Sequence, residues 1–337
     1  MVTMLSVVVG GFFGDEGKGK ITSYLALNRS MDAVVRAGTG PNAGHTVVHD
    51  GRTYKLRLIP SGFTSPQAKL MIGPGVLVKE DIVLKEIEET KIKDRFFIDR
   101  HTGVITQEIV DMEKNDNFLM NVVGSTGSGS GMGNAQRALR KLKLAKDFPS
   151  LEPYCADVSE MLNDIIDEGG NILVEGSQST FLSLYHGTYP FVTSKDVAAS
   201  GALSDIGVGP TRCDEVIVVF KSFVTRVGEG HLEGELSSEE VVKRGWQEFG
   251  TVTGRLRRAA PFDFDLAKRA VRINGATAIA LTKMDILYPE ITGKTSITDL
   301  QGESLEFVEK IEDYTSVPVK YISTGPSSTD LIIRETN

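Results

Sequence analysis

A carboxylate inside a glycine-rich loop is the first feature of the sequence that could do chemistry. Asp15 lies in the segment Gly10–Lys20, which follows a short apolar run and precedes a helical pattern. A strand, a glycine loop and a helix in that order point backbone N–H groups and a positive helix end at an anion, so the segment predicts a phosphate-binding loop. A carboxylate beside phosphate is unfavourable unless it holds a metal ion or takes a proton, which makes Asp15 a candidate for both tasks.

This loop differs from two common phosphate-binding motifs. In a Walker A loop ending at Gly17 and Lys18, a glycine would stand at Phe12 and a magnesium-binding hydroxyl would replace Gly19. The dinucleotide fingerprint Gly-x-Gly-x-x-Gly does not occur in the segment either. These differences argue against a dehydrogenase and weaken a second alternative, a non-catalytic GTP-binding switch.

A second glycine-rich segment, Gly38–Thr46, carries a histidine. His45 is one of only five histidines and lies among small residues that would let a ligand approach. Imidazole is suited to donating a proton or to stabilising a leaving oxygen, so His45 is a candidate catalytic residue.

Two further segments indicate the kinds of ligand. Three arginines stand within four residues at the end of Gly250–Arg258, and guanidinium groups bind carboxylates bidentately, so this segment suits a ligand with two carboxylates. The segment Thr282–Asp285 ends an apolar run, and Asp285 could accept hydrogen bonds from N1–H and the 2-amino group of guanine. Adenine lacks that pair of donors, so the pattern indicates a guanine nucleotide.

The elements that must position these residues alternate between strand and helix. Continuous apolar runs predict buried strands at Leu5–Val9, Ala33–Arg36, Leu70–Ile72, Ile172–Val174, Val216–Phe220, Ala276–Leu281 and Val317–Ile322. Helical patterns lie near Lys18–Leu27, Glu80–Glu89, Ala135–Ala145, Val158–Asp167, Asp263–Ile273 and Leu305–Ile311. The alternation predicts an α/β fold with a mostly parallel central sheet, helices on both faces and glycine-rich ligand loops at strand ends. We expect one large domain over residues 1–337, with peripheral subdomains.

The composition excludes several classes of protein. Lys and Arg number 37 against 45 Asp and Glu, for a net charge of −8, which argues against a general nucleic-acid binder. Two cysteines cannot form a disulfide framework and fit a reducing compartment. No long apolar run or basic leader is present, so we expect a cytoplasmic protein that does not span a membrane.

The segments Gly14–Lys20 and Asn42–Thr46 together resemble the adenylosuccinate synthetase family, whose members make adenylosuccinate from IMP, L-aspartate and GTP. The resemblance extends over nearly the whole chain and includes the glycine-rich loop Gly124–Gly133. It implies a ligase of purine biosynthesis that releases GDP and phosphate.

The resemblance implies a mechanism in two steps. Asp15 would remove the proton from N1 of IMP, and the purine O6 would attack the γ-phosphate of GTP to give 6-phosphoryl-IMP. The amine of aspartate would then displace phosphate. His45 would stabilise the transferring phosphoryl group and act as an acid, and Lys18 would contact phosphate or balance the charge of Asp15. One Mg²⁺ per active site would be bound by Asp15 and the carbonyl of Gly44.

The resemblance also assigns residues to each ligand. For GTP it implies Gly14, Glu16, Gly17, Gly19, Lys20, Gly44, Thr46, Lys283, Asp285, Ser323 and Gly325. For IMP it implies Asp15, Lys18, Asn42, Ala43, Thr126, Arg140, Gln178, Thr193, Val227 and Arg257. For aspartate it implies Thr251, Thr253, Gly254, Arg255 and Arg257.

Two points about partners and substrates follow from the resemblance. Arg140 would reach the IMP of a neighbouring subunit, which implies a homodimer. Related viral enzymes use dGMP in place of IMP, and their loop aspartate is replaced, so Asp15 favours IMP. A viral-type 2-aminoadenylosuccinate synthetase and a GTP-binding switch are the alternatives.

Overall fold

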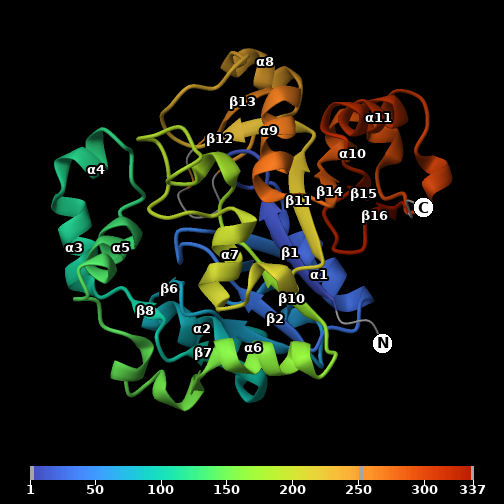
Figure 1. The fold of residues 1–337 in the computed structure, drawn as a ribbon. Coiled ribbons are helices and arrows are strands. Elements are labelled where there is room, and N and C mark those ends of the chain that lie inside the picture. Colours follow the sequence, from blue (N-terminus) through green and yellow to red (C-terminus); the bar gives the residue numbers. More distant parts are fainter. Residues whose placement is uncertain (1–3, 250–253, 255, 335–337) are drawn as a thin grey trace.

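The computed structural model describes residues 4–249, 254 and 256–334. Within this part of the chain, a ten-stranded sheet runs through the molecule (Figure 1). Its strands, in spatial order, are β16 (Leu331–Ile333), β15 (Val319–Ser323), β14 (Ala278–Thr282), β11 (Glu215–Lys221), β1 (Leu5–Gly10), β10 (Ile172–Glu175), β2 (Ala33–Arg36), β5 (Lys69–Ile72), β7 (Phe96–Asp99) and β9 (Cys155–Ala156). Neighbouring strands are parallel except β16, which pairs antiparallel with β15. The predicted parallel α/β sheet is therefore confirmed.

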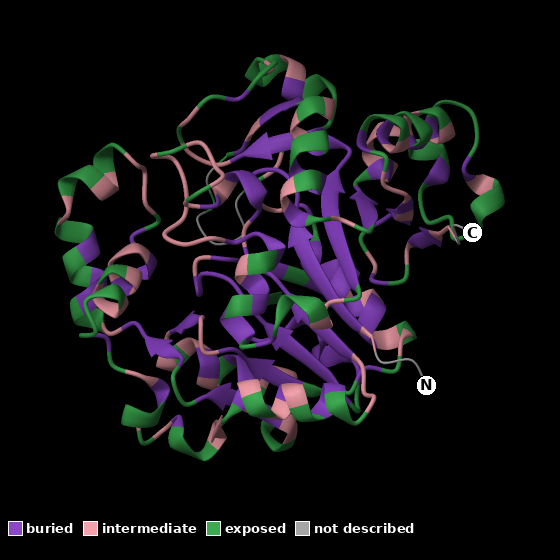
Figure 2. Ribbon diagram, viewed as in Figure 1, coloured by how far each residue is buried: buried purple, intermediate pink, exposed green. Residues whose placement is uncertain are grey.

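Helices cover both faces of this sheet. On one face α6 (Val158–Asp167), α7 (Ala199–Ile206), α9 (Phe264–Asn274) and α11 (Glu303–Thr315) share a hydrophobic cluster with Leu5, Val7 and Val9 of β1, and on the other α1 (Lys18–Asn28) and α2 (Glu80–Thr90) share a cluster with Val8. Figure 2 shows the buried sheet between partly exposed helices. Burial on both faces explains why these strands are continuous apolar runs in the sequence.

The predicted helices are confirmed except for one, whose bounds are wrong. The pattern Ala135–Ala145 predicts a helix that the structure instead places at Ser130–Ala138 (α5). The helix begins after Gly129, at φ 87°, and the chain turns at Arg140, whose φ of 62° is left-handed. The glycine-rich segment therefore forms the first turns of the helix, which a pattern based on helix-forming residues overlooks.

Smaller elements surround the sheet. Figure 1 shows α3 (Gln107–Asn115), α4 (Asn117–Asn121) and α5 grouped to one side of it. The remaining strands and α-helices are the hairpin β3 (His45–His49) and β4 (Arg52–Leu56), the parallel pair β6 (Leu77–Val78) and β8 (Gly103–Val104), the pair β12 (Phe223–Arg226) and β13 (Arg258–Pro261), α8 (Ser238–Lys243) and α10 (Met284–Leu287). Among the described residues, no helix has both the length and the apolar character needed to cross a bilayer.

Candidate active site

A cavity of about 1380 Å³ opens where loops leave the carboxyl ends of β1, β2, β10, β14 and β15. Parallel strands bring these ends to one edge of the sheet, which is where ligands bind in open α/β sheets. The volume exceeds the roughly 300–1,000 Å³ of a typical single-ligand pocket, so there is room for more than one ligand. The sequence-predicted residues that line it are Gly14, Asp15, Glu16, Gly17, Lys18, Gly19, Lys20, Asn42, Ala43, Gly44, His45, Thr46, Thr126, Gln178, Thr193, Val227, Arg257, Lys283, Asp285, Ser323 and Gly325.

Glu16 shapes the first loop from within. Its carboxylate is buried and accepts hydrogen bonds from the backbone N–H of Phe12 (3.1 Å) and Gly14 (2.9 Å), the ammonium of Lys18 (3.1 Å) and the hydroxyl of Ser179 (2.5 Å). Contacts with Lys18 and Ser179 lower the pKa of Glu16 although burial alone would raise it. The Glu16 side chain therefore holds the loop, and contact of Glu16 with GTP stays a prediction.

Lys18 is the ion-pair partner of Glu16 and not of Asp15. The Lys18 side chain is 3% exposed. Lys18 is the first residue of helix α1, and no side chain caps the start of this helix at Gly17. Uncapped N–H groups at a helix start attract phosphate. The next residue, Gly19, allows a close approach, since a Cβ there would lie 3.0 Å from the Cβ of His45. The glycine that replaces a Walker A hydroxyl thus makes room for the histidine.

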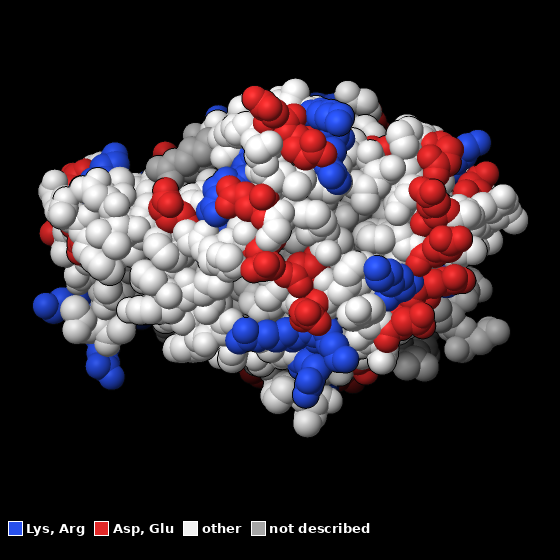
Figure 3. Space-filling model, turned by 90° about the horizontal axis from the view of Figure 1, so that it is seen from above, with Lys and Arg blue, Asp and Glu red and all other residues white. Residues whose placement is uncertain are grey.

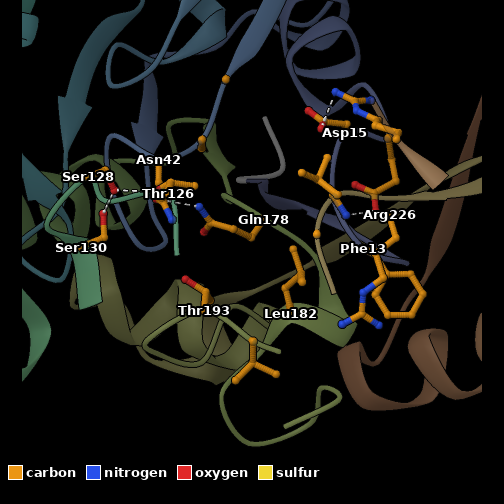
Figure 4. Close-up of a pocket in the computed structure, with 18 of the residues that line it drawn as sticks. Phe13, Asp15, Asn42, Thr126, Ser128, Ser130, Gln178, Leu182, Thr193 and Arg226 are labelled. Carbon is orange, nitrogen blue, oxygen red and sulfur yellow. Dashed lines mark hydrogen bonds and ion pairs between the residues drawn. The ribbon is translucent and has the colours of Figure 1, made fainter. Parts of the chain in front are cut away.

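Asp15 faces the cavity from a left-handed backbone position, φ 59° (Figure 4). Its side chain is 28% exposed, and one carboxylate oxygen lies 2.5 Å from Nη2 of Arg257. Burial raises the pKa of Asp15, and the positive charges of Arg257 and Lys221 oppose the rise only in part. A carboxylate with a raised pKa is a stronger base, which suits removal of a proton.

His45 lies at the start of β3 with a 5% exposed side chain. Its Nδ1 contacts the carboxylate of Glu175 and lies 2.6 Å from Nη1 of Arg36. Burial, and after it the charge of Arg36, lowers the pKa of His45 to about 4. The imidazole is therefore neutral near pH 7.

Lys20 forms hydrogen bonds with the loop that follows β15. Its ammonium donates to Ser323 Oγ (2.6 Å), the Gly325 carbonyl (2.6 Å) and the Asp330 carbonyl (2.8 Å). Burial lowers the pKa of Lys20 to about 8. These bonds use all three ammonium protons, so the side chain of Lys20 positions this loop, and contact of Lys20 with GTP stays a prediction.

The loop after β14 carries the predicted guanine contacts. Lys283 has a left-handed φ of 61°, and Ser222 donates to its carbonyl (2.7 Å). This turn brings Asp285 to the cavity wall. Thr282 donates to the Glu16 carbonyl (2.6 Å) and so ties the phosphate loop to the guanine loop.

Amide and hydroxyl side chains line the opposite end of the cavity (Figure 4). Gln178, at φ 56°, donates to Asn42 Oδ1 (3.0 Å) and accepts from Thr39 N–H (3.4 Å). The hydroxyl of Thr39 lies 3.1 Å from that of Thr193. Thr126 donates to a serine hydroxyl of its own glycine-rich loop (3.0 Å). These neutral groups suit hydrogen bonding to a base, a ribose and a phosphate.

Three functional side chains were missed by sequence reasoning. Glu248 accepts from Lys221 (2.6 Å) and Arg257 (2.8 Å) and lies 3.5 Å from the Lys283 ammonium, so it joins the guanine end to the Asp15 end. Arg36 and Glu175 contact His45. A charge at the end of an apolar strand was the available signal for the latter two, because burial of a charge in a sheet requires a partner.

Some predicted residues lie elsewhere. Arg140 is exposed at the end of α5, outside the cavity, and Gly254 is exposed and does not line it. Thr251, Thr253 and Arg255 lie outside the described residues.

The donors available for a metal ion are oxygens. No cluster of three or more His, Cys, Asp or Glu occurs among the residues that the structure describes. Mg²⁺ is typically held by one or two carboxylates with substrate phosphates and water, so the carboxylate of Asp15, which faces the cavity, and the backbone of Gly44 fit it.

One face of the surface carries charges of both signs. Seen from above, Lys and Arg side chains stand in separate groups among Asp and Glu (Figure 3). Polyanion binding uses a basic face or stripe, and this face presents a mixture of both charges.

Comparison with known proteins gives a consistent result. A family profile described as adenylosuccinate synthetase matches residues 7–149 and 141–291. The chain is 51% identical to the adenylosuccinate synthetase of Methanococcus aeolicus over 324 residues, 95% of this chain and 96% of that protein. Its fold is similar to that of a fully ligated adenylosuccinate synthetase from Plasmodium falciparum, with a TM-score of 0.89 and 23% identity over 98% and 99% of the two chains.

A second solved structure is also similar. It is a succinoaminodeoxyadenylate synthetase of cyanophage S-2L bound to dGMP and dATP, with a TM-score of 0.82 and 26% identity over 100% of this chain and 97% of that one. Because both the profile and a half-identical relative extend over most of the chain, this chain belongs to the adenylosuccinate synthetase family.

Proposed function

We propose that this cavity joins IMP to L-aspartate, with hydrolysis of GTP to GDP and phosphate, by way of 6-phosphoryl-IMP. GTP-dependent ligation in purine biosynthesis is the activity of the family to which the chain belongs. The observation that carries the finer proposal is that Asp15, His45 and Asp285 line a single cavity large enough for several ligands.

Asp15 is the proposed base for the first step. It takes the N1 proton of IMP, the electron pair moves to O6, and O6 attacks the γ-phosphorus of GTP as GDP leaves. The raised pKa of Asp15 supports this role, as does its position beside the phosphate loop. In the second step the amine of aspartate bonds to C6, loses a proton and displaces phosphate, which carries O6 away.

Positive and neutral groups are proposed to hold the substrates in place. Arg257, with its guanidinium 2.5 Å from Asp15, would turn to a substrate carboxylate when aspartate binds. Asp285 would accept hydrogen bonds from guanine, and Gln178 and Thr193 would bind IMP. Mg²⁺ held by Asp15 and the carbonyl of Gly44 would neutralise charge on the transferred phosphoryl group.

We also propose a homodimer that acts in the cytoplasm. Exposed apolar side chains lie on the α3–α5 group near Arg140, and burying them against a second copy would bring that arginine to a neighbouring cavity. They are Met112, Phe118, Val122 and Leu139. Mixing Arg140→Leu with Asp15→Asn subunits is expected to restore part of the activity that each variant lacks alone, and no recovery would contradict shared sites. The two cysteines are unpaired, as is ordinary in a reducing compartment.

A product assay tests the proposal against its alternatives. IMP or dGMP is offered with aspartate and GTP, and the products are identified by mass spectrometry. We expect adenylosuccinate from IMP, with phosphate release only when IMP and aspartate are both present. Product from dGMP alone would identify the activity of the cyanophage relative, and GTP hydrolysis without either substrate would indicate a switch protein.

A further inference from the structure

A buried triad of charged and imidazole side chains lies behind the cavity. Glu175 ends β10 and pairs in register with Arg36, which ends the neighbouring strand β2. The two side chains are 0% and 1% exposed, and Nη1 of Arg36 lies 3.3 Å from Oε2 of Glu175. The other oxygen, Oε1, contacts Nδ1 of His45.

The carboxylate of Glu175 is held in one orientation. Ser61 N–H donates to Oε2 at 2.7 Å, on the side away from the imidazole. The charges of His45 and Arg36 lower the pKa of Glu175 to about 2, although burial alone would raise it. An ionised carboxylate accepts hydrogen bonds and does not donate them, so a proton shared between Glu175 and His45 belongs to Nδ1, and Nδ1 then does not accept from Nη1 of Arg36, 2.6 Å away.

This triad is costly for the fold. A buried ion pair contributes little net stability compared with apolar side chains of similar volume, because both charges lose their hydration. Its position at the cavity edge, in contact with a candidate catalytic residue, indicates a task beyond stability.

We propose that Glu175 and Arg36 are positioning residues that act through His45. Glu175 accepts the Nδ1 proton, which leaves Nε2 as the nitrogen directed to the cavity that His45 lines. Arg36, with Nη1 3.3 Å from Oε2, holds the Glu175 carboxylate in place. The inference rests on the proposed function only in taking the group that meets Nε2 to be the transferred phosphoryl group.

The substitution Glu175→Gln gives a sharp test. The amide removes the charge that holds the Nδ1 proton, and Arg36, with Nη1 already 2.6 Å from Nδ1, can then donate to it. We expect the proton to move to Nε2, which ¹⁵N NMR of the histidine nitrogens reports without any substrate. We expect kcat to fall about 100-fold or more with KM values within about threefold. Glu175→Asp, which keeps the charge, should retain the Nδ1 proton and rescue part of kcat.

Glu215→Gln is the matched control, since Glu215 is also buried and paired with an arginine, Arg29, at 2.7 Å, and does not line the cavity. It should lower stability but leave the tautomer and kcat unchanged.

An Nε2 proton on His45 in the unsubstituted protein would overturn the inference, whether or not Glu175→Gln folds. Wild-type kcat and tautomer in Glu175→Gln would also overturn it. The NMR measurement uses no substrate. A result that contradicts the role of Glu175 can therefore be distinguished from a failure of the protein to form adenylosuccinate.

Discussion

Replacing Asp15 by asparagine removes the proposed base with little change in shape. The amide side chain is the same size as the carboxylate, and both residue types tolerate the left-handed backbone found at this position. The substitution removes the negative charge that would accept the N1 proton of IMP. It therefore separates chemistry from packing.

The magnitude follows from the surroundings of Asp15. A general base contributes about 10²–10⁴-fold, and without N1 deprotonation O6 is a poor nucleophile, so kcat should fall about 10³-fold or more. Burial raises the pKa of Asp15, so its charge is less favourable in the fold than in the unfolded chain despite the ion pair with Arg257. Asparagine relieves this penalty but also breaks that ion pair, so we expect only a small change in the free energy of unfolding.

The assay follows phosphate release with all three substrates, together with GTP binding by calorimetry and thermal unfolding. GTP should still bind, because backbone groups and Asp285 remain. Glu235→Gln is the control, since Glu235 pairs with Arg258 next to Arg257 but lies outside the cavity, and it should keep full activity. Asp15→Asn activity within tenfold of the unsubstituted enzyme would refute the assignment of the base.

Three further predictions concern the same cavity. Asp285→Asn should lower kcat/KM for GTP at least about 100-fold and raise it for xanthosine triphosphate, whose position 2 carries an acceptor; unchanged GTP preference in competition assays would mean that guanine binds elsewhere. Glu16→Gln leaves the Lys18 ammonium buried without its carboxylate and should cost about 3–5 kcal/mol in the free energy of unfolding, measured by urea denaturation; a loss below about 1 kcal/mol would contradict this account of the loop. The unfolded chain takes up a proton on His45 near pH 6.5 and the folded one only near pH 4, so stability should fall as the pH drops through this window, by at most about 3 kcal/mol. His45→Gln should reduce that dependence, and an equal slope in both proteins would contradict the neutral imidazole.

The strands and the edge that binds ligands could be predicted from the sequence. Runs such as Val216–Phe220 are apolar on both faces, and glycines follow the strand ends, so the sheet and its ligand loops can be predicted from the sequence. The direction in which a loop side chain points cannot be predicted in this way. The positions of Glu16 and Lys20 in the phosphate loop suggest side chains that contact a ligand. In the structure both side chains instead form hydrogen bonds that hold protein loops.

The pairing of charged side chains between neighbouring strands could not be predicted from the sequence either. Glu175 and Arg36 meet because β10 lies beside β2, and this order depends on how the whole sheet assembles. Glu248 likewise contacts Lys221 and Lys283 only after distant segments come together. A charge at a strand end could have been noted, but its partner required the tertiary structure.

The fate of the purine oxygen tests the central claim most directly. IMP labelled with ¹⁸O at position 6 is converted with aspartate and GTP, and the phosphate is analysed by mass spectrometry. Transfer through 6-phosphoryl-IMP predicts one ¹⁸O in each phosphate released. Unlabelled phosphate alongside adenylosuccinate would contradict attack by O6 on the γ-phosphate.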